Sequence, residues 1–546
     1  MSMRTYTEEK RIRPDVLTGA VYLSCMVFMV FEMIIQRIIG DKGAFFLTAP
    51  MVLYLLFYCV YVLAVQKAVY VMVRLRARRS QFQNARTNMV RTLRIFAITG
   101  SVSGVLIILT SYLLSSRILG TERCLFLLII SGAAIIFLGV QGAIRGFLQG
   151  IGYTRPIMLS DLLIAVVSLF TGSIASGVMY SYGLKVNELL HVDEFSAVYG
   201  AAGALFGVLL GSVAGLVQSI VSYRVRKREI DEFVKTGAPR YLDNKNDVLL
   251  GVRPIIVLYA SPALMVLLDI FFYCFVSKKM GLNESYMTSY GVFSGKVIPT
   301  IVFLILLCCL PYIRSWNRVM ARIERDELEG ARDRYRRLIR FSNMLFMPVS
   351  VFSFVCASSI LVALFGKGST FASNLLMSAS LIIYFGCAAV FFAWLLNHMG
   401  KSVIIMLNIG LTWIVHIAAI FLLVVVLKLD VQGVVFSIAI AFFVFDALCY
   451  FLLKKMLRYN QEYIYTFLLP LGASALSGLA VFFLNGFLAG AIGEILTLIL
   501  CVVIYWALYM VFMVVSKALR PYELQRIPLG SLFIGLSQSV TGQTGE

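Results

Sequence analysis

Charged side chains are scarce in this sequence: Asp, Glu, Lys and Arg together make up 14% of its 546 residues. Soluble domains carry about 25% of such residues. Hydrophobic residues instead account for 60% of the chain, and the mean hydropathy is +0.89. The charges fall in clusters between long uncharged stretches, so the composition excludes a soluble protein and predicts a polytopic helical membrane protein.

Histidine is scarcer still, and the three histidines, His191, His398 and His416, are scattered along the chain. The ten cysteines lie almost all in apolar stretches and form no C-x-x-C pair. This pattern favours small buried residues over disulfides or zinc ligands. We therefore expect no metal site and no cofactor.

Acidic residues are too few to balance the basic ones, and the net charge is +20. In a soluble protein this excess would suggest a nucleic-acid partner. Here the basic residues lie at the ends of apolar stretches, so membrane orientation and anionic lipid explain them better. No nucleic-acid partner is expected.

Long apolar stretches are what the sequence has in abundance, and a membrane-spanning helix needs about 20 such residues. Fourteen stretches qualify, at approximately residues 16–39, 45–73, 95–116, 124–148, 157–181, 198–223, 254–277, 289–313, 341–365, 374–398, 403–427, 431–453, 462–485 and 491–516. They predict an all-α membrane protein of two six-helix lobes and two further helices.

The predicted domains follow this count. They are an N-lobe (1–223), a cytoplasmic linker (224–253), a C-lobe (254–453), two additional helices (454–516) and a polar, frayed tail (517–546). Residues 314–340, charged at helical spacing, predict a cytoplasmic helical extension. The turn after the fourth helix has a similar sequence in both lobes, Leu148–Thr154 and Leu396–Ser402, which suggests an internal repeat.

Basic residues also predict the orientation. With the N-terminus inside, the inside segments hold 36 of the 48 Lys and Arg residues and the outside loops hold eight. Cytoplasmic segments carry the excess of Lys and Arg in membrane proteins. We expect a multi-pass protein of the plasma membrane with both termini in the cytoplasm.

The stretch from Gly139 to Asp161 is the most unusual part of the chain. It places Arg145 about two turns inside an apolar helix, where an arginine costs about 3 kcal/mol on insertion scales. Five glycines around it thin the helix surface and predict a closely packed neighbour or ligand. Pro156 is expected to start the next helix after a short turn.

Two sequence blocks resemble those of a known family. Residues 145–150 read R-G-F-L-Q-G and are followed by T-R-P and a new helix, and Tyr199–Gly211 reads Y-G-A-A-G-A-L-F-G-V-L-L-G. Together they resemble the polysaccharide and lipid II flippase branch of the MOP exporter superfamily, in particular its stage V sporulation protein B-like members. The resemblance implies a MATE-like fold that moves a polyprenyl-pyrophosphate-linked saccharide from the inner to the outer leaflet by alternating access. Membrane potential or an ion gradient would drive the movement.

Four cations and four acids lie within the apolar stretches. The cations are Arg37, Lys67, Arg145 and Lys296, and the acids are Glu32, Asp161, Asp269 and Asp446. Glu32 and Asp161 are expected to pair locally, and Asp269 to pair with Lys296. The net charge of the side chains within the membrane is therefore positive or neutral, and never negative. This predicts a water-filled, cationic cavity that attracts an anion.

The resemblance assigns roles to several of these residues. Arg37, Lys67 and Arg145 match basic positions on the first, second and fourth helices, and Gln149 is the glutamine of the R-G-x-x-Q-G motif. Lys296 joins them as a predicted lining residue of the cationic cavity. Asp269 resembles a seventh-helix aspartate, and Asp269 and Glu32 are expected to couple an ion or form a salt bridge. The Gly-Pro that often precedes the second-helix lysine is replaced by Val62–Ala64, which leaves the bend there open.

Three functional classes remain open at the level of sequence. The first is the flippase just described, with an anionic lipid-linked saccharide, the bilayer and a coupling cation as partners. The second is a cation-coupled multidrug antiporter of the same superfamily. The third is a non-transporting membrane scaffold of a cell-envelope machine. An enzyme is not expected. Membrane glycosyltransferases usually need paired acids in a long first outer loop, whereas here that loop, Gly40–Ala44, is short and holds Asp41 alone.

Overall fold

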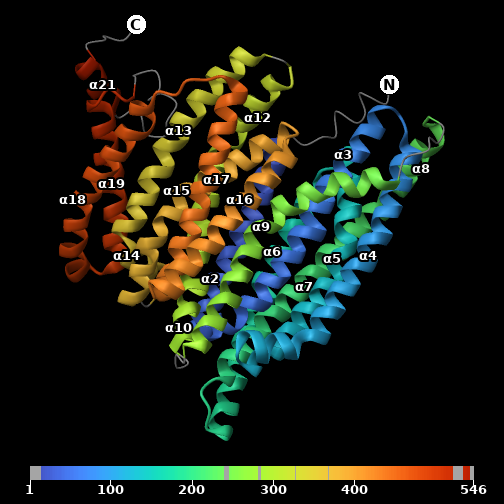
Figure 1. The fold of residues 1–546 in the computed structure, drawn as a ribbon, viewed down its shortest axis with the longest axis horizontal. Helices are drawn as coiled ribbons and strands as arrows, with labels where there is room; N and C mark the ends of the chain where they lie inside the picture. Colours follow the sequence, from blue (N-terminus) through green and yellow to red (C-terminus); the bar gives the residue numbers. More distant parts are fainter. Residues whose placement is uncertain are drawn as a thin grey trace. The chain divides into compact units, whose positions relative to one another are not determined.

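The structure is a computed structural model that describes residues 14–238, 245–280, 285–325, 327–366, 368–519 and 533–541 (Figure 1). Every regular element in these ranges is a helix. Thirteen of the described helices are long and apolar enough to cross a membrane. The first of them, Val16–Arg78, contains the first two predicted stretches, and each of the fourteen stretches overlaps a spanning helix. The stretch at 341–365 runs past the end of its spanning helix at Val355 into a separate short helix, Ala357–Phe365. The predicted all-α polytopic membrane protein is confirmed.

The chain forms two compact units. The first comprises residues 1–303 and 400–434, and the second comprises residues 304–399 and 435–546. The six-plus-six-plus-two division of the sequence stays a prediction.

The first unit contains the elements that hold most of the candidate site residues. Its helices are α2 (Pro14–Phe57), α3 (Val65–Arg78), α4 (Phe82–Tyr112), α5 (Leu125–Gly150), α6 (Arg155–Leu190), α7 (Phe195–Val225), α8 (Lys227–Thr236), α9 (Lys245–Lys279), α10 (Ser285–Val292), the start of α11 (Ile298–Cys309) and α16 (Ser402–Ile420). Short π-helical or 3-10 segments link them: η1 (Tyr58–Ala64), η2 (Leu113–Leu119), η3 (Glu122–Cys124), η4 (Phe293–Val297) and η6 (Phe421–Val426).

The second unit contains the later helices. They are α12 (Ile313–Ile323), α13 (Leu328–Val355), α14 (Ala357–Phe365), α15 (Thr370–His398), most of α17 (Asp430–Leu457), α18 (Leu469–Ile492), α19 (Glu494–Val515) and α21 (Ile534–Thr541). The segments η5 (Leu310–Tyr312) and η7 (Ile464–Leu468) connect them. The charged extension predicted at 314–340 is helical except for a break between Ile323, where α12 ends, and Leu328, where α13 begins. Most of the predicted tail lies outside the described residues.

Two irregularities shape the first 78 residues. Gly40 has φ 70° and ψ −174°, which interrupts α2 between the first two predicted stretches. The loop expected at Gly40–Ala44 is therefore wrong: one left-handed glycine makes the break and the chain returns to helix at once. Farther on, η1 widens the helix over Tyr58–Ala64, the segment where the sequence left the bend open.

The turn between α5 and α6 agrees with the sequence prediction. α5 ends at Gly150, Gly152 has φ 110°, and α6 begins at Arg155 with Pro156 in its first turn. The turn between α15 and α16 has the same design, because Gly400 has φ 71° at the matching place in the repeat. Both turns thus need a residue without a Cβ.

Glycines on α5 let α3 and its preceding segment approach at backbone distance. A Cβ added to Gly142 would lie 2.0 Å from the carbonyl oxygen of Tyr61, and one on Gly146 would lie 2.5 Å from that of Gln66. The close neighbour predicted from these glycines is confirmed, and it is the second spanning segment. Such small-residue contacts are the usual basis of helix packing in lipid.

One ion-pair cluster joins three segments of the first unit. Glu194, just before α7, accepts from Lys42 of α2 at 3.1 Å and from Arg123 of η3 at 3.2 Å. Partial burial raises the pKa of Glu194, but the hydrogen bonds and charges of Lys42 and Arg123 outweigh burial and lower it below its ordinary value of 4.5. The carboxylate is therefore held ionised, which ties these segments together.

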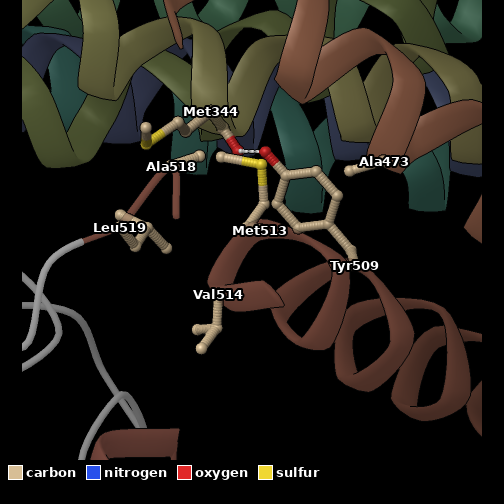
Figure 2. Close-up of a cluster of buried hydrophobic side chains, with 7 residues drawn as sticks. All are labelled: Met344, Ala473, Tyr509, Met513, Val514, Ala518 and Leu519. Atoms are coloured by element: carbon tan, nitrogen blue, oxygen red, sulfur yellow. Dashed lines mark hydrogen bonds between the residues drawn. The ribbon is translucent and has the colours of Figure 1, made fainter. Parts of the chain in front are cut away.

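The second unit has its own apolar core where α13, α18 and α19 meet. Figure 2 shows Tyr509 of α19 pointing at α13, where its hydroxyl donates to the carbonyl oxygen of Met344 at 3.0 Å. Met513 lies beside it and is fully buried. The hydrogen bond leaves no polar group of the tyrosine unpaired, so an otherwise apolar contact can hold α19 against α13.

Candidate functional site

Arg145 lies fully buried in an ion pair. Its Nη2 donates to Oδ1 of Asp161 on α6 at 2.5 Å, and the two side chains are 1% and 5% exposed. Tyr58 of η1 donates to the same oxygen at 2.9 Å. The pair joins α5, α6 and the π-helical segment, so the expectation that Arg145 faces a water-filled cavity is corrected: here it has a carboxylate of its own.

Lys296 is also paired, but not with the predicted acid. Its Nζ lies 2.8 Å from Oδ1 of Asp41, and Gln36 donates to the same oxygen at 2.6 Å. The contact joins η4 to α2 directly after the break at Gly40. Asp41 was read as an isolated loop acid in the sequence, and the pairing of Lys296 with Asp269 is therefore wrong.

Asp269 instead contacts His416, which is not among the predicted site residues. Nε2 of His416 on α16 lies 2.8 Å from Oδ1 of Asp269 on α9, and both side chains are buried. The local ion pair expected for Asp161 is found, because its partner is Arg145 on the preceding helix. Glu32 is half-buried and forms no ion pair with a described residue.

Lys67 is the predicted site residue whose charge stays without an acid. Its Nζ lies 5.6 Å from the ring centroid of Tyr70, and the guanidinium carbon of Arg74 lies 5.6 Å from the same centroid. Arg74 also donates to the Tyr70 hydroxyl, and its Nε is buried with no partner in the described chain. No described carboxylate pairs with Lys67 or Arg74.

We call Lys67, Tyr70 and Arg74 the cationic patch. The three residues are spaced i, i+3 and i+7 on α3, so they share one face of the helix. One residue before Lys67, Gln66 donates to Oε1 of Gln149 on α5 at 3.0 Å. This bond fixes Gln149, a predicted site residue, at the contact between α3 and α5.

Arg37 lies outside this patch. It is exposed on α2, between the buried residues Gln36 and Ile39. Of the five predicted cavity residues, the structure therefore brings Lys67 and Gln149 onto adjacent helices, Arg145 and Lys296 into separate ion pairs, and Arg37 to an exposed position.

Two cations lie beside one tyrosine ring with no described acid to balance them, and this arrangement favours the binding of an anion. A phosphate would accept hydrogen bonds from both side chains and reduce the repulsion between them. Arg74 is not among the predicted site residues, because it follows the second apolar stretch and resembles the arginines that set membrane orientation. Its spacing of seven residues from Lys67 is the signal that would place both cations on one helix face.

The arrangement of these helices is that of a known class of membrane protein. No family model matches the chain. Among solved structures, the lipid II flippase MurJ in an inward closed conformation has a TM-score of 0.65 and 13% identity, covering 92% of this chain and 98% of that one. An inward-facing multidrug resistance MATE family transporter has a TM-score of 0.60 and 15% identity, covering 81% and 98%. The chain thus has a MATE-like fold.

The chain is also similar in sequence to a curated protein. The chain is 21% identical over 214 residues to stage V sporulation protein B of Bacillus subtilis (strain 168). The match covers 39% of this chain and 38% of that protein, well under two thirds of its length. Together with the fold, it supports the resemblance to the flippase branch. The two solved structures are a flippase and a transporter, not enzymes, in agreement with the sequence-based expectation.

Proposed function

We propose that this protein moves an anionic, polyprenyl-pyrophosphate-linked saccharide from the inner to the outer leaflet of the plasma membrane by alternating access. The observation that carries the proposal is the cationic patch, in which Lys67 and Arg74 flank one tyrosine and have no described acid. The similarity in fold to a lipid II flippase supports the same class of cargo.

The cationic patch is better suited to bind cargo than the two paired cations. Arg145 and Lys296 would have to leave Asp161 and Asp41 before they could meet a phosphate, whereas Lys67 and Arg74 need break no ion pair. A planar guanidinium can hold two phosphate oxygens at once, and a lysine can add a third contact. The patch therefore matches a pyrophosphate in charge.

Membrane potential is a sufficient source of energy for such a cargo. Each elementary charge that moves through 100 mV gains about 2.3 kcal/mol. With a negative interior, a doubly charged pyrophosphate is driven outward, in the direction of export. No nucleotide would then be needed.

The test is a flipping assay with the full chain in proteoliposomes, using a fluorescent polyprenyl-pyrophosphate-linked saccharide. We expect Lys67→Ala and Arg74→Ala each to slow flipping at least tenfold, since a charge-assisted hydrogen bond contributes about 1.5–3 kcal/mol. The matched control is Arg78→Ala, which removes an exposed cation from the end of the same helix. Collapse of the membrane potential should slow the wild type.

Equal rates in all four proteins would contradict the role of the cationic patch. Uptake of a cationic drug in place of the anionic lipid would identify a multidrug antiporter instead. No transport of either compound would favour the scaffold.

A further inference from the structure

Asp446 differs from the other buried acids of the chain, because it has no partner. It is 7% exposed, and neither carboxylate oxygen makes a hydrogen bond with any described residue. It lies 16 residues after the start of α17 and 11 before its end. At a rise of 1.5 Å per residue it is about 24 Å and 17 Å from the two ends, well inside a hydrocarbon core of about 30 Å.

The comparison with Asp161 and Asp269 shows why this is unusual. Asp161 has Arg145 and Tyr58, and Asp269 has His416, so each of these carboxylates is stabilised by a partner. An ionised carboxylate without hydrogen bonds or a countercharge is strongly disfavoured in an apolar medium, and the neutral acid is the form that such a site accepts. Asp446 is therefore built to hold a proton.

The neighbours of Asp446 add polarity but no positive charge. Phe385 of α15 lies 5.4 Å from Phe443 of α17 between ring centroids, so the two helices are adjacent here. Tyr384 of α15 is close enough to feel the charge of Asp446, and its hydroxyl donates to Oδ1 of Asn343 on α13 at 2.8 Å. The hydroxyl proton of Tyr384 is thus committed to Asn343 and does not satisfy Asp446.

Titratable side chains on α15 and α17 lie near the site. They are Tyr384 and Cys387 on α15, and Cys449, Tyr450 and Lys454 on α17 itself. Lys454 lies more than two turns from Asp446 and donates to Tyr463 at 3.2 Å. None of these neighbours forms an ion pair with Asp446 in the described structure.

We propose that Asp446 is a proton-binding site of the second unit. One proton adds to a carboxylate oxygen, an O–H bond forms, and the charge of the site changes from −1 to 0. Among the described residues, Asp446 belongs to no group of three or more His, Cys, Asp or Glu side chains that could hold a metal ion, whereas a proton needs only one carboxylate oxygen.

The site supplies a second energy source for the proposed export. If α17 exposes Asp446 to water in one conformation and buries it in the other, then the proton must be taken up or released in each cycle. This coupling rests on the proposed transport function, whereas proton binding at Asp446 does not.

Infrared difference spectroscopy tests proton binding without any cargo. The full chain in lipid is compared with Asp446→Asn, and with the control Asp333→Asn, which removes an exposed acid on α13. At neutral pH we expect the carbonyl band of one protonated carboxylic acid to vanish in Asp446→Asn and to persist in Asp333→Asn. Asp446→Glu keeps a carboxylic acid at this position and should keep the band. It therefore distinguishes loss of the proton site from a general folding defect.

The same four proteins then enter the flipping assay with an imposed proton gradient. We expect the gradient to change the wild-type rate at least threefold and to have no effect on Asp446→Asn. An unchanged infrared band in Asp446→Asn, or a band that appears only when sodium is removed, would overturn the proton site. A missing band together with no flipping by the wild type would leave the proton site standing and refute the proposed function alone.

Discussion

The buried pair of Arg145 and Asp161 makes a prediction that separates a structural role from a cargo-binding one. Asp161→Asn keeps the shape of the side chain but removes the charge that balances Arg145. Nε and Nη1 of Arg145 already have no described partner, so no neighbouring group can compensate. Removal of one member of a buried ion pair costs about 3–5 kcal/mol. We expect Asp161→Asn to lower the free energy of unfolding by about this amount.

A double variant gives the reasoning its control. Arg145→Gln combined with Asp161→Asn leaves a neutral amide pair of similar size, with an acceptor still available to Tyr58. Because no buried charge remains, the double variant should recover most of the stability lost in Asp161→Asn. Tyr58→Phe removes a single hydrogen bond and should cost about 1 kcal/mol.

Chemical unfolding of the purified full chain in detergent, followed by circular dichroism, measures these differences. If the pair is structural, the wild type is the most stable protein and Asp161→Asn is the least stable. Tyr58→Phe and the double variant lie between them. If Asp161→Asn is as stable as the wild type, or if the double variant is no more stable than Asp161→Asn, the reasoning is refuted. Arg145 would then be available to another partner.

Two further predictions concern packing and pH. Gly142→Ala places a methyl group against the Tyr61 carbonyl oxygen, where the Cβ would lie 2.0 Å away, and should cost about 1–3 kcal/mol in unfolding experiments; Gly177→Ala, where a Cβ meets nothing within 4 Å, should be nearly neutral. Glu194 has a lowered pKa in the folded chain, so its ion pairs stabilise the fold above the ordinary value of 4.5 and are lost as the pH falls through the lower folded value. Glu194→Gln should therefore be about 1 kcal/mol less stable than the wild type near pH 6, with the difference shrinking toward pH 3. A Gly142→Ala protein as stable as Gly177→Ala, or a Glu194→Gln difference that grows in acid, would contradict these contacts.

The spanning helices could be predicted from the sequence because hydropathy depends on nothing outside each segment. Each of the fourteen apolar stretches overlaps a described spanning helix, and Pro156 and Gly152 mark the turn that their chemistry predicts. The glycines of α5 likewise predict a closely packed helix. Each of these signals depends only on residues near it in the sequence, so it does not change with the way the helices pack.

The partners of the buried charges could not be predicted in the same way. Asp41 lies 255 residues from Lys296, and Asp269 lies 147 from His416. Nothing in the sequence next to either acid indicates the side chain that it meets. The choice depends on which helices are adjacent and on their relative rotation. Arg74 was missed for a different reason, since a basic residue at the end of a spanning segment is typical of orientation signals as well as of anion sites.

The central claim is that the cationic patch binds the phosphate groups of a lipid-linked saccharide. Equilibrium binding of a polyprenyl-pyrophosphate to the full chain in nanodiscs, compared with the same polyprenol lacking phosphate, tests it most directly. We predict that the wild type and Arg78→Ala prefer the pyrophosphate at least tenfold, and that the Lys67→Ala/Arg74→Ala double variant binds both lipids equally. A double variant that retains the full preference would contradict the account.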